Sequence, residues 1–179
     1  MFTTIILPGI GGSGEDHWQT YWERSLSGAI RFHPRDWNHP DLIDWIEALD
    51  RTVAESQTPP LLVAHSLACL LVAHWAARST RSIRGALLVA VPDPDIPVFP
   101  VEARSFANAP ASALPFPALV IASTNDPFAS LDYVSKRAKG WGSGLVIAGA
   151  IGHINEASGL NDWPQGAALF EAFCAGTNH

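Results

Sequence analysis

Short apolar runs alternate with amphipathic stretches along the whole chain. Most of the apolar runs are continuous and do not alternate with polar residues, a pattern typical of strands covered on both faces of a sheet; they lie at residues 3–7, 29–33, 61–65, 85–91, 118–123 and 144–149. Between them, apolar residues recur at helical spacing, at residues 15–26, 41–56, 67–78, 131–140 and 164–176. This alternation predicts a six-stranded, mainly parallel sheet with right-handed crossovers and helices on both faces.

The spacing inside a helical stretch predicts which side chains enter the core. In residues 15–26, Trp18, Trp22 and Leu26 recur at every fourth position, as on the buried face of a helix. Such bulky aromatic side chains are more typical of packing than of ligand contacts. We therefore expect the tryptophans of the helices to lie mainly in the core.

Residues 92–117 interrupt the alternation of strands and helices. This segment is rich in proline and only weakly periodic, with a short helix expected around residues 102–108. It is too short to form a cap domain but long enough to wall a pocket. We therefore expect one domain over residues 1–179, a three-layer α/β sandwich without a large cap.

Composition and charge narrow the class of protein. Hydrophobic residues make up 47% of the 179 residues and charged residues 16%, as in a folded domain with a large core. The net charge of −6 argues against nucleic-acid binding, which needs a basic face. The longest apolar stretch, residues 61–77, is too short and too interrupted to span a membrane. Because the first residues lack the basic region of a signal peptide, we expect a cytoplasmic protein.

The two cysteines, Cys69 and Cys174, both lie in apolar helical patterns. A free thiol in such a place packs as a small hydrophobic group, so we expect two inert core thiols. No spacing of cysteine and histidine matches a zinc site. The sequence therefore predicts neither a metal nor a cofactor.

Ser66 stands between an apolar strand and an apolar helix, in the sequence LLVAHSLACLL. This is the context of a nucleophile elbow, a turn so tight that the residues two before and two after the serine must be small. Here these residues are Ala64 and Ala68 instead of the usual glycines. In an elbow, Ser66 would be a nucleophile at a helix N-terminus; the alternative is a serine that only caps the helix.

A nucleophilic serine needs a histidine base, which in this kind of fold comes later in the chain. Three histidines follow Ser66. His74 lies well inside the next helical stretch and His179 is the last residue, whereas His153 directly follows the last strand. The carboxyl ends of parallel strands share one edge of the sheet, so His153 is the candidate base.

The base in turn needs a carboxylate to orient it. Asp126 follows the strand at 118–123 and lies between Ser66 and His153 in the chain. Asp93 and Asp95 follow an earlier strand and are the alternatives, while Asp132 is expected to face water. Asp126 also precedes proline, so an ordinary turn is the competing interpretation.

Backbone N–H groups beside the serine would stabilise an oxyanion. The amide of Leu67, at the start of the helix, is the first candidate. The second should come from the glycine-rich loop LPGIGGSG after the first strand, with Ile10 ahead of Gly11.

The same loop also matches the dinucleotide-binding pattern GxGxxG, with Asp36 22 residues beyond it as a candidate ribose ligand. Bulky His17 and Trp18 count against this alternative, because they occupy the helical turn where a dinucleotide-binding helix needs small residues. Dinucleotide binding would also leave the candidate serine, histidine and aspartate without a role.

The chain resembles a known family in five blocks, LPGIGGSGEDHWQTYWE, RDWNHPDLIDWIEAL, VAHSLA, STNDPFAS and GHIN. It is similar to the compact serine hydrolases related to retinoblastoma-binding protein 9, the YdeN-like hydrolases. The resemblance implies an α/β-hydrolase fold without a large cap and a catalytic triad at Ser66, Asp126 and His153. Leu71 stands where the retinoblastoma-binding motif LxCxE needs glutamate, so that partner is not expected.

Together these features predict a serine hydrolase that cleaves a small carboxylic ester, or an amide or thioester, through an acyl-enzyme. His17, Trp18 and the 92–117 segment are candidates for the wall of the substrate pocket. The alternatives are a binding or interaction protein on a hydrolase scaffold and, less favoured, a dinucleotide-binding protein. No oligomeric state is predicted.

Overall fold

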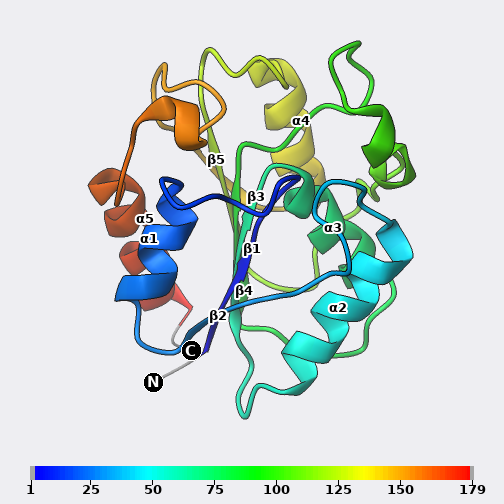
Figure 1. The fold of residues 1–179 in the computed structure, drawn as a ribbon, viewed down its shortest axis with the longest axis vertical. Helices are drawn as coiled ribbons and strands as arrows, with labels where there is room; N and C mark the ends of the chain where they lie inside the picture. The colour runs from blue at the N-terminus through cyan, green and yellow to red at the C-terminus, as the bar shows by residue number, and fades with distance from the viewer. Residues whose placement is uncertain (1–2, 178–179) are drawn as a thin grey trace.

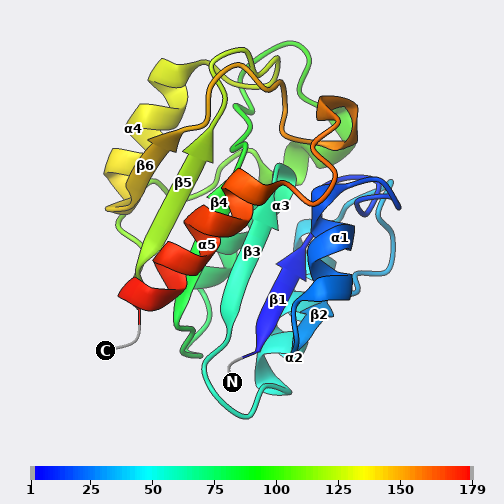
Figure 2. The ribbon, with the colours of Figure 1, turned by 90° about the vertical axis from the view of Figure 1, so that its left-hand side faces the viewer.

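The computed structural model describes residues 3–177, and a six-stranded parallel sheet lies at its centre (Figures 1 and 2). The strand order is β2-β1-β3-β4-β5-β6, with β1 (Thr4–Leu7), β2 (Ala29–Arg31), β3 (Leu61–His65), β4 (Gly85–Val89), β5 (Ala118–Ala122) and β6 (Gly144–Ile147). All six strands were predicted from the apolar runs. Several end one or two residues earlier than expected, because the chain turns into the loops at the carboxyl edge.

Five α-helices cover the two faces of the sheet: α1 (Trp18–Ser25), α2 (Leu42–Ala54), α3 (Leu67–Ala76), α4 (Leu131–Trp141) and α5 (Pro164–Gly176). α1 and α5 lie on one face, and α2, α3 and α4 lie on the other (Figures 1 and 2). The three-layer sandwich is therefore confirmed. α1 begins later than the sequence predicts, because the side chain of His17 caps it by accepting from the N–H of Gln19.

The alternating side chains of the strands build two separate cores. Along β1, Ile5 packs with α2 and α3, whereas Ile6 packs with α1 and α5. The middle layer is thus buried on both sides, as the continuous apolar runs predicted. The tryptophans of the helices are all buried, as expected: Trp18, Trp22, Trp45, Trp75 and Trp141.

The proline-rich 92–117 segment forms the short 3₁₀-helix η1 (Val101–Phe106), close to the helix expected at 102–108. Phe106 is fully buried and packs on Trp45 of α2. The segment is therefore held against the sandwich as a wall and does not form a cap domain. A second 3₁₀-helix, η2 (Glu156–Ser158), lies in the long loop before α5.

The two thiols differ in their surroundings. Cys69 is fully buried in α3, where burial raises the pKa of its thiol and the S–H donates to the carbonyl of Val89. Cys174 packs against the core but is only half-buried, so it is not the fully buried thiol that was expected; partial burial still raises its pKa to about 11. Across residues 3–177, no helix has the length and apolarity needed to cross a membrane.

Candidate active site

The candidate site lies where the sheet changes its winding direction. From β1 the chain moves outward to β2, and from β3 onward it moves toward the opposite edge. The loops after β1 and β3 therefore part, and they leave a crevice at the carboxyl ends of the strands. Ser66 directly follows β3, and Asp126 and His153 lie in the loops that follow β5 and β6. Because the strands are parallel, these loops share one edge of the sheet (Figure 2).

Ser66 occupies a strained turn between β3 and α3, with φ +54° and ψ −123°. Few residues with a side chain adopt a positive φ, and here it turns the hydroxyl out of the chain path. Ala64 and Ala68 are fully buried on either side of it. A Cβ on Gly9 would lie 3.0 Å from the Ser66 Cβ, so the loop after β1 approaches this closely only because residue 9 is glycine.

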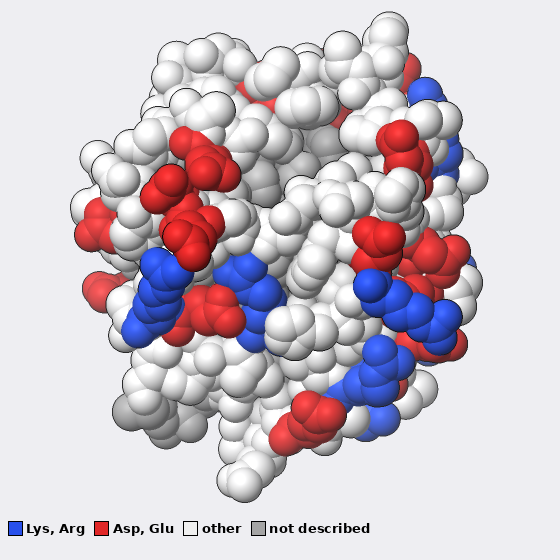
Figure 3. Space-filling model, in the orientation of Figure 1, with Lys and Arg blue, Asp and Glu red and all other residues white. Residues whose placement is uncertain are grey.

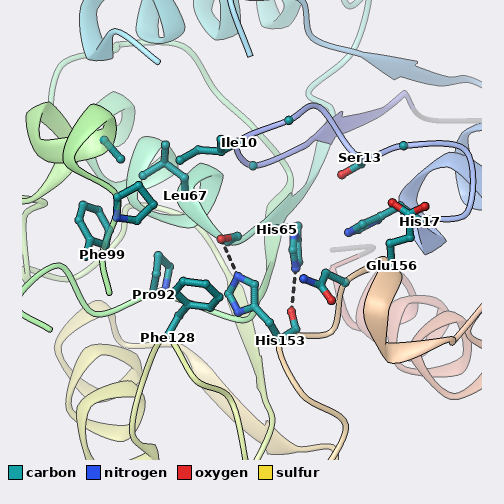
Figure 4. Close-up of a pocket in the computed structure, with 17 residues that line it drawn as sticks. Ile10, Ser13, His17, His65, Leu67, Pro92, Phe99, Phe128, His153 and Glu156 are labelled. Carbon is teal, nitrogen blue, oxygen red and sulfur yellow. Dashed lines mark hydrogen bonds between the residues drawn. The ribbon is translucent and has the colours of Figure 1, made fainter. Parts of the chain in front are cut away.

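The hydroxyl of Ser66 makes no capping bond to α3, which separates it from an ordinary helix-capping serine. Its Oγ lies 2.8 Å from Nε2 of His153 instead (Figure 4). The other ring nitrogen of His153, Nδ1, lies 2.9 Å from both carboxylate oxygens of Asp126. The structure thus brings the three residues into one continuous hydrogen-bonded chain.

Asp126 combines the two interpretations that the sequence left open. Its Oδ1 also accepts the N–H of Phe128, so the carboxylate closes a turn and orients the histidine at once. The carboxylate of the alternative Asp93 is used within its own loop, where it accepts the N–H of Asp95. Asp132 faces water as expected, with 77% of its side chain exposed.

The other two histidines after Ser66 do not compete with His153. His74 is buried in α3 and donates from Nε2 to the carbonyl of Phe106. His179 lies outside the described residues.

Hydrogen bonds from neighbouring loops hold His153 in place. His65 donates from Nε2 to the backbone carbonyl of His153 at 3.0 Å (Figure 4). Asn125 accepts the N–H of Gly152 at 2.7 Å and the hydroxyl of Ser123 at 2.8 Å. Sequence reasoning missed these residues, although His65 adjoins Ser66 and Asn125 adjoins Asp126 in the chain.

The structure separates the two candidates for the second oxyanion donor. The N–H of Gly11 donates to the carbonyl of Trp37 at 3.0 Å, so the expectation that Gly11 could serve is wrong. Ile10 remains the candidate beside Leu67. All three residues border the same pocket as Ser66.

A pocket of about 390 Å³ opens above Ser66. Leu67, Phe99 and Phe128 form an apolar end, and Pro92, Phe99, Pro100 and Ala103 come from the 92–117 segment, as predicted (Figure 4). Ser13, His17 and Glu156 line the other, more polar end. Figure 3, drawn in the orientation of Figure 1, shows a hollow in the upper half of the visible surface. The hollow is walled mainly by uncharged residues, and acidic and basic side chains are interspersed on its flanks.

The two residues expected at the pocket wall near α1, His17 and Trp18, lie in different surroundings. His17 lines the pocket, but Trp18 does not. Trp18 is 1% exposed, packs on Trp22 and Trp163, and donates its indole N–H to the carbonyl of Ile154. Successive residues of a helical turn point about 100° apart, so only one of this pair can face the crevice.

The GxGxxG loop serves packing in this structure. A Cβ on Gly12 would lie 3.0 Å from the ring of Trp37, and one on Gly14 would lie 3.2 Å from the Glu156 carboxylate. Asp36, the candidate ribose ligand, accepts the N–H groups of Asn38 and His39 in its own turn. Within residues 3–177, no group of three or more histidine, cysteine, aspartate or glutamate side chains could hold a metal.

Two buried histidines make the fold sensitive to acid. Burial lowers the pKa of His17 from 6.5 to about 4, and it holds the pKa of His65 well below its usual range. Between pH 6.5 and 4 the unfolded chain binds a proton that folded His17 does not. The stability is therefore full above pH 6.5 and is lost as the pH falls toward 4.

Lowering the pH from 7 to 5 should reduce the free energy of unfolding by on the order of 2 kcal/mol through His17 alone. Urea unfolding at both pH values measures this loss, which should shrink by about that amount in His17→Gln. His33→Gln, at an exposed histidine, is the control and should keep the wild-type pH dependence. An equal loss in wild type and His17→Gln would contradict the prediction.

Comparison with protein-family models identifies the chain. The model described as "Serine hydrolase" matches residues 4–172. The chain belongs to this family. Among solved structures, this serine hydrolase is similar to a YdeN-like hydrolase from Pectobacterium atrosepticum, with 31% identity, 98% of this chain and 91% of that chain covered, and a TM-score of 0.88. The expected membership of the YdeN-like group is thereby confirmed.

Two further structures share the fold. The ydeN gene product of B. subtilis is 19% identical, with 98% of this chain and 100% of that one covered and a TM-score of 0.82. RedJ, a thioesterase from the prodiginine biosynthetic pathway in Streptomyces coelicolor, is 15% identical, with 96% and 88% covered and a TM-score of 0.65. No curated protein matches the sequence of this serine hydrolase. The α/β-hydrolase fold without a large cap is as predicted.

Proposed function

We propose that this serine hydrolase cleaves a small carboxylic ester through an acyl-enzyme, with Ser66, His153 and Asp126 as its catalytic triad. The observation that carries the proposal is the 2.8 Å contact between Ser66 Oγ and His153 Nε2 in a turn where the hydroxyl caps no helix. A binding protein on the same scaffold has no physical need for this arrangement.

The proposed reaction has two halves. First, Ser66 Oγ attacks the ester carbonyl carbon while His153 Nε2 takes the hydroxyl proton. The tetrahedral intermediate then collapses, and His153 returns the proton to the leaving alcohol. In the second half His153 deprotonates a water, which attacks the acyl-enzyme; the acid leaves and the proton returns to Ser66. Asp126 orients the imidazole and stabilises its positive charge throughout.

The amides of Leu67 and Ile10 are the proposed donors to the oxyanion. Leu67 is the first residue of α3, whose opening N–H groups have no preceding turn to bond to. One such donor is worth on the order of 10²–10³ in rate. The short apolar end of the pocket at Phe99 and Phe128 suits a substrate with a short or medium acyl chain.

Thioesters are the second candidate substrate, and the likeness to the RedJ thioesterase fold favours testing them. The free thiols of Cys69 and Cys174 suit a reducing compartment, so we place the activity in the cytoplasm. No nucleic-acid, membrane or retinoblastoma-type partner is proposed.

A fluorophosphonate probe tests the proposal directly, because it phosphonylates only an activated serine. We expect labelling of the wild type, none of Ser66→Ala and strongly reduced labelling of His153→Ala. Parallel assays with p-nitrophenyl butyrate and butyryl thioesters then separate the two substrate classes. Failure to label the wild type, or equal labelling of Ser66→Ala, would instead favour a binding protein.

A further inference from the structure

His17 carries an unused hydrogen-bond donor at the polar end of the pocket. The residue is 4% exposed, and its Nε2 is the one buried side-chain nitrogen or oxygen without a hydrogen-bond partner among residues 3–177. Its Nδ1 accepts the N–H of Gln19 at 3.1 Å, so Nδ1 carries no proton. A neutral imidazole then has its proton on Nε2.

His17 stays neutral near pH 7. Burial is the main cause of its lowered pKa of about 4, and the charge of Arg31 acts in the same direction. The ring therefore presents one N–H donor and no positive charge. A buried donor without an acceptor lowers the stability of the fold, so native structures seldom keep one without a reason.

The N–H donor of His17 lies close to the candidate catalytic triad. The ring of His17 packs edge-on against His65, with their centroids 4.7 Å apart, and His65 lies 5.1 Å from the ring of His153. Nε2 of His65 donates to the His153 carbonyl, and within residues 3–177 no hydrogen bond joins Nε2 of His17 to the other ring nitrogen of His65. In Figure 4, His17 lies across the pocket from Phe99 and Phe128, with His65 and His153 between the two ends.

We propose that Nε2–H of His17 donates a hydrogen bond to a neutral oxygen of the substrate, and so selects esters with a hydroxyl, ether or carbonyl oxygen over purely aliphatic ones. This inference rests on the proposed function and names the substrate class. Glu156 lines the same end and adds a negative charge there, which disfavours an anionic acceptor. The apolar end at Phe99 and Phe128 takes the hydrocarbon part.

Two variants separate this donor from the capping role of His17. Asparagine is a good helix cap and replaces Nδ1, but its side chain does not reach the Nε2 position. Glutamine places an amide N–H near the Nε2 position and loses the cap. His17→Asn should therefore lose the substrate contact, whereas His17→Gln should keep it and lose thermal stability instead.

Two pairs of esters of equal length measure the contact. On the alcohol side the pair is 2-hydroxyethyl butyrate and propyl butyrate, and on the acyl side it is p-nitrophenyl methoxyacetate and p-nitrophenyl butyrate. For each pair, the measured quantity is the ratio of kcat/KM for the oxygen-bearing ester to kcat/KM for its aliphatic match. Intrinsic differences in ester reactivity cancel when variants are compared with the wild type.

In one of the two pairs we expect this ratio to fall about tenfold in His17→Asn and to recover in His17→Gln. The pair that responds shows which part of the substrate meets His17. Ratios that stay at the wild-type value in His17→Asn for both pairs would overturn the inference, as would an equal fall in both variants. Wild type that turns over none of these esters would overturn the proposed function itself, and the inference with it.

Discussion

Ser66→Ala is expected to lower kcat/KM for p-nitrophenyl butyrate by roughly 10⁴–10⁶-fold. The substitution removes the attacking oxygen and leaves a pocket with no other nucleophile held by His153. Alanine fits the elbow, because the neighbouring positions Ala64 and Ala68 show that small side chains pack there. The thermal midpoint should therefore stay near that of the wild type.

Ser25→Ala is the matched control for this measurement. Ser25 is an exposed serine at the end of α1, and its hydroxyl bonds only to the carbonyl of Trp22 in the same helix. We expect wild-type kinetics from it. Folded Ser66→Ala protein with more than a tenth of the wild-type rate would contradict the role of Ser66 as nucleophile.

Asp126→Asn is expected to lower kcat by about 10³–10⁴-fold. The asparagine oxygen can still accept the N–H of Phe128, so the turn should fold. Its amide N–H, however, would donate to Nδ1 of His153 and move the ring proton to Nε2. His153 could then no longer take a proton from Ser66, which is 2.8 Å away.

Steady-state kinetics of Asp126→Asn and Asp132→Asn check this expectation side by side. Asp132 lies six positions along the chain, is exposed and pairs with Lys136, so its variant should remain active. A similar rate for Asp126→Asn and wild type would show that the carboxylate only closes the turn. A loss of rate that merely follows a loss of thermal stability would lead to the same conclusion.

The sequence went far toward this fold because its signals are local. Continuous apolar runs marked all six strands, and helical spacing marked α2, α3, α4 and α5 within one or two residues. Once the strands are parallel, whatever follows each one must lie at the same edge of the sheet. That rule placed Ser66, Asp126 and His153 together without any knowledge of side-chain geometry.

Other features depend on contacts between distant segments and followed only from the structure. The backbone carbonyl of Trp37 accepts the N–H of Gly11, which leaves the N–H of Ile10 as the candidate second oxyanion donor. At the start of α1, His17 lines the pocket and Trp18 lies in the core. No pattern along the chain predicts such choices, because each depends on which group from another segment lies opposite.

By itself, then, the sequence determined the sheet, its helices and the edge at which polar residues gather, since these follow from periodicity and chain direction. Only the tertiary structure decided how the individual groups are used. It left Ser66 Oγ free of the helix cap and directed toward His153, and it joined His65 to the loop of His153. These outcomes depend on three-dimensional packing, in which a shift of one ångström exchanges one hydrogen-bond partner for another.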